Sequence, residues 1–262
     1  MAGDRIRQSL VIAGTVVALI GAVVGSGAAG GTPIPKVAGG ALSADATLLA
    51  PAGPAFAIWS VIYGGLVAYA IWQALPSQAA RDRQRRAGFW VLASLLLNAG
   101  WILSVQAGAL GLSVVAIVAL LVVLIAAYVV LRRHPGGTTA DAVLLDGVVG
   151  LYLGWVMVAT VANITSWLMQ AGFDGWGLSP HAWAIALLGV FAVIGCALAL
   201  WDRGRFAPAV ASAWGLAWIG VSRLTGSLPS APVAISAFAA AALILLVALA
   251  VRVTRPSPGR RG

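Results

Sequence analysis

Long apolar stretches separated by short polar segments run through the whole sequence. A helix needs about 20 predominantly apolar residues to cross a hydrocarbon core about 30 Å thick. Eight stretches meet this requirement, and the seventh is the shortest. They are approximately residues 9–29, 55–75, 89–107, 112–131, 144–169, 182–200, 206–222 and 232–251. The pattern therefore predicts an all-α fold, a polytopic transmembrane helical bundle of about eight helices.

Basic residues favour the same arrangement. If the N-terminus is cytoplasmic, the alternation of eight helices puts fourteen arginines on the cytoplasmic side and leaves only Lys36 and Arg223 on the other. The fourteen are Arg5, Arg7, Arg81, Arg83, Arg85, Arg86, Arg132, Arg133, Arg203, Arg205, Arg252, Arg255, Arg260 and Arg261. Cytoplasmic loops of membrane proteins carry an excess of Lys and Arg. We therefore predict that both termini are cytoplasmic.

Composition narrows the class of protein. Hydrophobic residues make up 61% of the chain and charged residues only 9%, whereas soluble domains are about 25% charged. The net charge of +9 lies in short runs between apolar stretches and not on one folded face, as nucleic-acid binding requires. The predicted partner is the lipid bilayer, in a bacterial plasma membrane, and no nucleic-acid partner is expected.

The first apolar stretch has two interpretations. Arg5 and Arg7 precede it, and Ser26-Gly27-Ala28 resembles the small-residue cleavage site of a signal peptide. Its apolar run is longer than the 7–15 residues typical of such peptides. Gly21-x-x-x-Gly25 is also typical of closely packed membrane helices. We therefore expect the helix to be retained.

Catalytic and metal-binding chemistry finds little support in the sequence. The chain has one cysteine, Cys196, and no glutamate. Neither His134 nor His181 has a second histidine or a carboxylate at a spacing suited to a metal site. No serine or cysteine nucleophile is accompanied by a base on a neighbouring element. We predict no catalytic residue, no metal site and no enzymatic activity.

Aromatic and amide side chains at mid-membrane positions form three stripes. Residues three or four apart share one face of a helix, and at 100° per residue the four members in the fifth stretch fall within about 80°. The members are Trp59 and Tyr63, then Asn98 and Trp101, then Tyr152, Trp155, Ala159 and Asn163. They are predicted to line one ligand pocket that opens towards the loop 30–54. Alternatively, the asparagines join helices through hydrogen bonds worth about 0.6–2 kcal/mol each.

Taken in order, the stripes resemble the TspO/MBR family, the tryptophan-rich sensory or translocator-like proteins. The family's second helix has W-x-x-x-Y after a Pro-rich start, as in Pro51 to Tyr63 here. Its N-x-x-W matches Asn98 to Trp101, and its Y-L-x-W-x-x-x-A-x-x-x-N matches Tyr152 to Asn163. The likeness covers about residues 6–170. Two features depart from the family: Phe56 and Trp59 are three residues apart where it usually has F-x-x-x-W, and the first loop has no tryptophan.

The resemblance implies a five-helix module over residues 1–170, followed by a three-helix C-terminal extension and basic tail over 171–262. It implies non-catalytic binding of a hydrophobic aromatic ligand such as a porphyrin, for sensing, buffering or transport, with the eight stripe residues as the lining. Flat aromatic ligands stack well on Trp and Tyr. No cofactor is expected, and a tetrapyrrole is a possible ligand. A small-molecule transporter and a helical subunit of a larger membrane complex are the alternatives, and a homodimer is left open.

Overall fold

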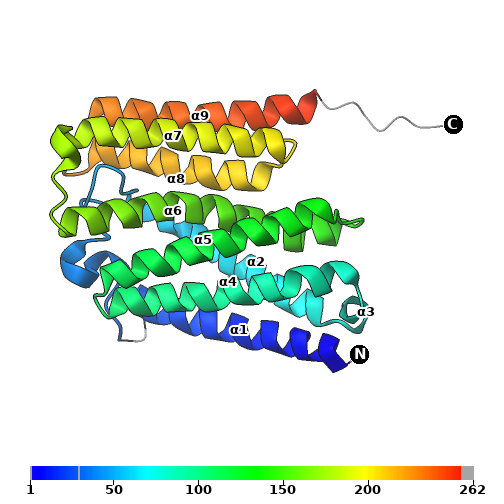
Figure 1. Cartoon of the computed structure of the whole chain (residues 1–262). Helices are drawn as coiled ribbons and strands as arrows, with labels where there is room; N and C mark the ends of the chain where they lie inside the picture. The colour runs from blue at the N-terminus through cyan, green and yellow to red at the C-terminus, as the bar shows by residue number, and fades with distance from the viewer. Residues whose placement is uncertain (1, 29, 255–262) are drawn as a thin grey trace.

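The computed structural model describes residues 2–28 and 30–254, and its long helices lie side by side, parallel or antiparallel (Figure 1). The long helices are α1 (Ala2–Ser26), α2 (Ile58–Ala74), α4 (Asp82–Gln106), α5 (Leu110–Arg133), α6 (Val148–Gln170), α7 (Pro180–Trp201), α8 (Phe206–Thr225) and α9 (Ala231–Val253). The short ones are α3 (Pro76–Ala79), η1 (Ile34–Gly40), η2 (Gly53–Ala57), η3 (Asp141–Gly147) and η4 (Gly175–Gly177). Each predicted stretch corresponds to one long helix. The predicted all-α bundle is confirmed.

Seven of these helices are long and apolar enough to cross a membrane, counting α2 with η2 and α6 with η3. The eighth long helix, α8, does not reach that hydropathy, although it lies alongside the others (Figure 1). Eleven of its twenty residues are buried, most of them Ala, Gly or Ser. A helix that turns so much of its surface to protein needs fewer large apolar residues than one that faces lipid.

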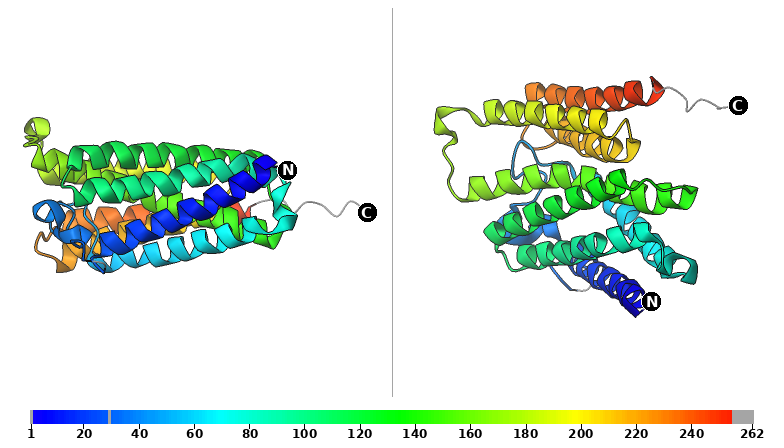
Figure 2. Two further views of the ribbon diagram at one scale, coloured as in Figure 1. Left: turned by 90° about the horizontal axis from the view of Figure 1, so that it is seen from below. Right: turned by 45° about the vertical axis from the view of Figure 1, so that its right-hand side comes forward.

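The first five long helices form a closed ring. α1 packs on α2 and α4, α4 packs on α5, α5 packs on α6, and α2 contacts α6 to complete it. The remaining three helices form a second layer, in which α8 packs on α6 and α9, and α9 packs on α7 (Figure 2). Each layer has its own cluster of buried apolar side chains. The helix α6 is therefore the joint between the two layers.

Arginines gather at one end of the bundle, here called the arginine-rich end, where α1 begins and α9 finishes (Figure 1). Arg83 lies between two carboxylates, contacting Asp141 at 3.4 Å and also Asp146. Those carboxylates are five residues apart on η3, a π-helix, whose i to i+5 repeat brings such positions to one side. Arg205, just before α8, bonds Asp146 at 3.1 Å. Arg255, Arg260 and Arg261 lie outside the described residues.

Glycines on α6 let α8 approach closely, as expected for a Gly-x-x-x-Gly spacing. A Cβ atom at Gly154 would collide with the carbonyl oxygen of Pro208 and would lie 3.0 Å from Cβ of Ala211. One turn earlier, a Cβ at Gly150 would lie 2.9 Å from Cβ of Ala207. The backbone contact between the two layers therefore requires glycine at both positions.

We predict that Gly154→Ala destabilises the protein by about 1–3 kcal/mol, because overpacking forces the α6 and α8 backbones apart. Thermal unfolding in detergent measures the change. Gly100→Ala on α4 is the matched control: a Cβ there meets nothing within 4 Å, so this variant should be neutral or slightly stabilised. Equal melting temperatures for Gly154→Ala and the native protein would contradict the close packing.

Candidate functional site

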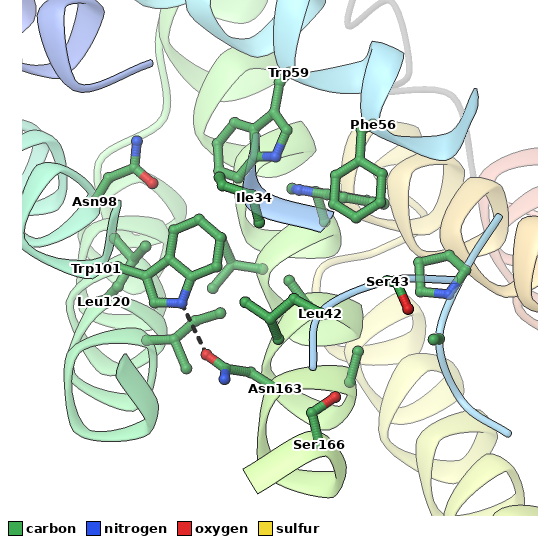
Figure 3. A pocket seen from close by; sticks show the side chains of 17 residues that line it. Ile34, Leu42, Ser43, Phe56, Trp59, Asn98, Trp101, Leu120, Asn163 and Ser166 are labelled. Atoms are coloured by element: carbon green, nitrogen blue, oxygen red, sulfur yellow. Dashed lines mark hydrogen bonds between the residues drawn. The ribbon is translucent and has the colours of Figure 1, made fainter. Parts of the chain in front are cut away.

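A cavity lies inside the five-helix ring, near the end opposite the arginine-rich end. Figure 3 shows the side chains that line it. Its volume is about 40 Å³. Side chains from α2, α4, α5 and α6 surround it, and the segment that connects α1 to α2 covers it. The lining residues are Ile34, Leu42, Ser43, Ala50, Pro51, Phe56, Trp59, Asn98, Trp101, Ile117, Leu120, Trp155, Val156, Ala159, Ala162, Asn163 and Ser166.

Six of the eight residues that the sequence singled out lie around this cavity. They are Trp59, Asn98, Trp101, Trp155, Ala159 and Asn163. Tyr63 and Tyr152 do not line it but support it from behind. The Tyr63 ring stacks on Trp59 with 5.3 Å between centroids, and Tyr152 meets Trp59 edge-on at 5.8 Å. The three helical stripes therefore converge, while their role in binding a ligand stays a prediction.

An aromatic wall forms one side of the cavity. Phe56 meets Trp155 with ring centroids 5.7 Å apart and planes at 81°, and Trp59 meets Trp155 at 6.2 Å and 84°. These edge-to-face contacts fix the indole orientations, since the positive edge of one ring lies against the negative face of the next. Phe56 belongs to the sequence motif but is not among the predicted lining residues. Its spacing of three residues from Trp59 puts both on one side of the chain.

Asn98 has one satisfied and one unsatisfied amide atom. Its Nδ2 donates to the Tyr63 hydroxyl at 2.6 Å, whereas its Oδ1 is buried without a hydrogen-bond partner. The indole Nε1 of Trp155 is buried and unpartnered too. Leaving such a group unpaired costs about 1–3 kcal/mol. Two residues of the lining thus retain hydrogen-bonding capacity that the protein itself does not use.

Asn163 joins three helices. Its Oδ1 accepts a hydrogen bond from Trp101 Nε1 at 2.8 Å (Figure 3), and its Nδ2 donates to Ser113 Oγ at 3.0 Å. Ser113, on α5, is not among the predicted site residues, although it is the only serine or threonine in a strongly apolar stretch. Each asparagine therefore bridges helices and also lines the cavity, while its role in binding a ligand stays a prediction.

The loop over the cavity, residues 34–55, is here called the lid. Ile34, Leu42 and Ser43 extend from it toward the helices (Figure 3). The sequence placed the pocket mouth next to this loop but identified none of its lining residues. The sequence feature that could have identified them is the presence of isolated apolar side chains within a segment rich in Gly, Ala and Pro.

Charged groups are absent from the lining of the cavity. Within residues 2–28 and 30–254, no three His, Cys, Asp or Glu side chains lie close enough together to hold a metal ion. The chemistry that the lining offers is therefore stacking, apolar contact and a few neutral hydrogen bonds.

A family model described as TSPO-like protein matches residues 11–250 of the chain. The match runs beyond the five-helix ring and through most of α9. No curated protein and no solved structure matches the sequence significantly.

We predict that Asn163→Leu lowers the unfolding free energy by about 1–2 kcal/mol, because hydrogen bonds between membrane helices are modest and this residue bonds to two other helices, α4 and α5. Thermal melting in detergent checks this. Thr165→Ala is the control, since its hydroxyl bonds only carbonyls of its own helix, at 3.0 Å. If both variants melt like the native protein, the bridge through Asn163 does not stabilise the bundle.

Proposed function

Because the chain belongs to the TSPO-like protein family, we propose that this integral membrane protein binds a bulky, flat, hydrophobic aromatic ligand, with a tetrapyrrole such as a porphyrin as the favoured class. The convergence of Trp59, Trp101 and Trp155 from three helices on one cavity is the observation that carries the proposal. Indole faces bind flat aromatic molecules through stacking and apolar contact. Ala159 is the small residue that leaves room beside this wall.

The size of the cavity sets a condition for binding. A volume of about 40 Å³ holds only about three water molecules, whereas pockets for drug-sized ligands measure about 300–1,000 Å³. The side chains of Ile34 and Leu42 occupy the side of the pocket that the lid covers. In the proposed bound state the lid moves outward, and the ligand takes the place of these two side chains.

The neutral lining determines how a ligand would lie. Burying an ionised carboxylate without a partner is strongly unfavourable, and no charged side chain lines the cavity. The ring system of a porphyrin would therefore stack inside, with its carboxylates at the mouth in water. The free Asn98 Oδ1 and Trp155 Nε1 would meet neutral polar groups of the ligand.

The proposed role is binding without chemical change, in sensing, buffering or transport. Members of the family are generally ligand-binding membrane proteins and not enzymes. Every residue of the lining falls between 34 and 166, which supports residues 1–170 as the binding module. Under this proposal the helices from α7 onwards modulate the module, although the family match includes them.

The proposed orientation places the arginine-rich end in the cytoplasm, following the positive-inside rule. The mouth of the cavity and the lid then face the outside of a bacterial plasma membrane. Both chain ends would be cytoplasmic, which requires that α8 cross the membrane along with the seven more apolar helices.

Ala159→Leu tests the pocket. The larger side chain would fill space next to Trp155 and Asn163, so the affinity for protoporphyrin IX should fall at least tenfold while thermal stability changes little. Quenching of tryptophan fluorescence measures binding. Trp155→Phe should weaken binding about three- to tenfold through lost stacking.

Trp72→Phe is the control for both pocket variants, since Trp72 lies near the other end of α2, where it contacts Tyr69 and Arg81. It should bind like the native protein. Normal porphyrin binding by Ala159→Leu would show that the ligand does not occupy this cavity.

Single cysteines in a Cys196→Ala background test the orientation. Lys36→Cys and Leu178→Cys should react with an impermeant thiol reagent on intact cells, because these exposed positions would face outward. Ser77→Cys and Thr139→Cys, exposed at the arginine-rich end, should react only after lysis. The reverse pattern would invert the proposed topology, and labelling of all four would rule out the eight-helix crossing.

A further inference from the structure

We propose that α8 acts as a latch that holds the lid closed over the cavity, with Arg223 as the positioning residue whose release limits access of the ligand. The latch itself is a property of the fold, and only its effect on ligand access rests on the proposed function. The latch also assigns a role to α8, which follows the binding module and contributes no residue to the lining of the cavity.

The lid runs along one face of α8. Trp214, Trp218 and Ser222 are spaced four residues apart and therefore share that face. Trp214 Nε1 donates to the carbonyl of Ala55 at 2.9 Å, and the carbonyl of Trp218 accepts from the amide of Ala52 at 3.1 Å. These bonds fix the part of the lid that leads into η2 and α2.

The next turn of α8 holds the tip of the lid. The carbonyl of Ala44 accepts hydrogen bonds from Arg223 Nη2 at 2.8 Å and from Ser222 Oγ at 3.3 Å. Asp45 Oδ1 accepts from the amide of Ser227, just beyond α8, at 3.3 Å. Hydrogen bonding from Ser227 holds the pKa of Asp45 below its usual range. The carboxylate therefore stays ionised, and an acceptor, at neutral pH.

Arg223 is fully buried, which is unusual for a cation. Its Nη1 donates to the carbonyl of Leu228 at 3.1 Å, and its Nη2 also contacts Ser222 Oγ at 2.7 Å. The guanidinium thus clamps two loops at once, the lid and the α8–α9 connection. Charge-assisted hydrogen bonds of this kind are roughly twice as strong as neutral ones.

Within the described part of the chain, the hydrogen bonds from residues 34–55 to long helices go to α8, apart from the one that the amide of Ile58 donates to the carbonyl of Ala55 where the lid continues into α2. One more goes to Ser227, just after α8. The lid's apolar side chains divide between the layers. Leu42 packs on the five-helix core, whereas Leu49 is 3% exposed within the core of the second layer. Moving Leu42 out of the cavity therefore strains the hydrogen bonds between the lid and α8.

Thiol accessibility tests the latch without any ligand. In a Ser43→Cys, Cys196→Ala background, Arg223→Met should raise the rate of N-ethylmaleimide labelling in detergent roughly tenfold, since it removes a charge-assisted contact to the lid. Trp214→Phe should raise it less. Lys36→Met is the matched control: it removes an exposed cation of the same loop and should leave the rate unchanged.

A reversible disulfide cross-link tests the latch separately, in case Arg223→Met does not fold. Asp45→Cys with Ser227→Cys, oxidised in the Cys196→Ala background, should slow amide hydrogen exchange of residues 42–46 and the association rate of protoporphyrin IX severalfold. Reduction should restore both.

The outcomes separate the two proposals. Faster labelling in Arg223→Met, with no porphyrin binding by any variant, supports the latch and refutes the ligand class. Faster association of porphyrin in Arg223→Met supports both. Unchanged labelling in Arg223→Met, or unchanged exchange and association in the oxidised cross-link, overturns the latch.

Discussion

The contact of α6 with α8 is the constraint on which the rest of the molecule depends. Glycines at 150 and 154 bring the two backbones together on one side of α6. On its other side the same helix presents Trp155, Ala159 and Asn163 to the cavity. Because α6 is shared, the spacing between the layers and the shape of the cavity cannot be set independently. The same constraint applies to the lid, because the lid is hydrogen-bonded to α8 while its side chains line the cavity beside α6.

Helical periodicity was sufficient to predict the helices and most of the aromatic wall. Trp59, Trp101 and Trp155 could be placed on inward faces because a regular helix fixes the direction of each side chain. The lid could not be derived in the same way. Its backbone follows no repeat: Ala38 and two neighbouring glycines have positive φ, and nothing in the sequence states which way Leu42 turns. The partners of Arg83 lie on a π-helix, and those of Arg223 lie in two loops. Local sequence patterns encode neither arrangement.

The asparagines show why the choice between structural and binding roles was not decided by sequence. In a membrane interior, an amide must find partners, and the partners of Asn163 are the indole of Trp101, which also borders the cavity, and the hydroxyl of Ser113. One side chain therefore determines both helix spacing and the polarity of the site. Asn98 differs, because its partner Tyr63 satisfies only the amide nitrogen.

Under the proposed function, a ligand dissolved in the membrane would reach the cavity from the leaflet at the end of the bundle where the cavity lies. A hydrophobic aromatic molecule dissolves in lipid far better than in water, so its effective concentration is the mole fraction in the leaflet at that depth. Molecules in the opposite leaflet must first flip across the bilayer. Occupancy of the site would therefore report on the composition of a single leaflet, and would respond to lipid asymmetry even when the total amount of ligand in the membrane is constant.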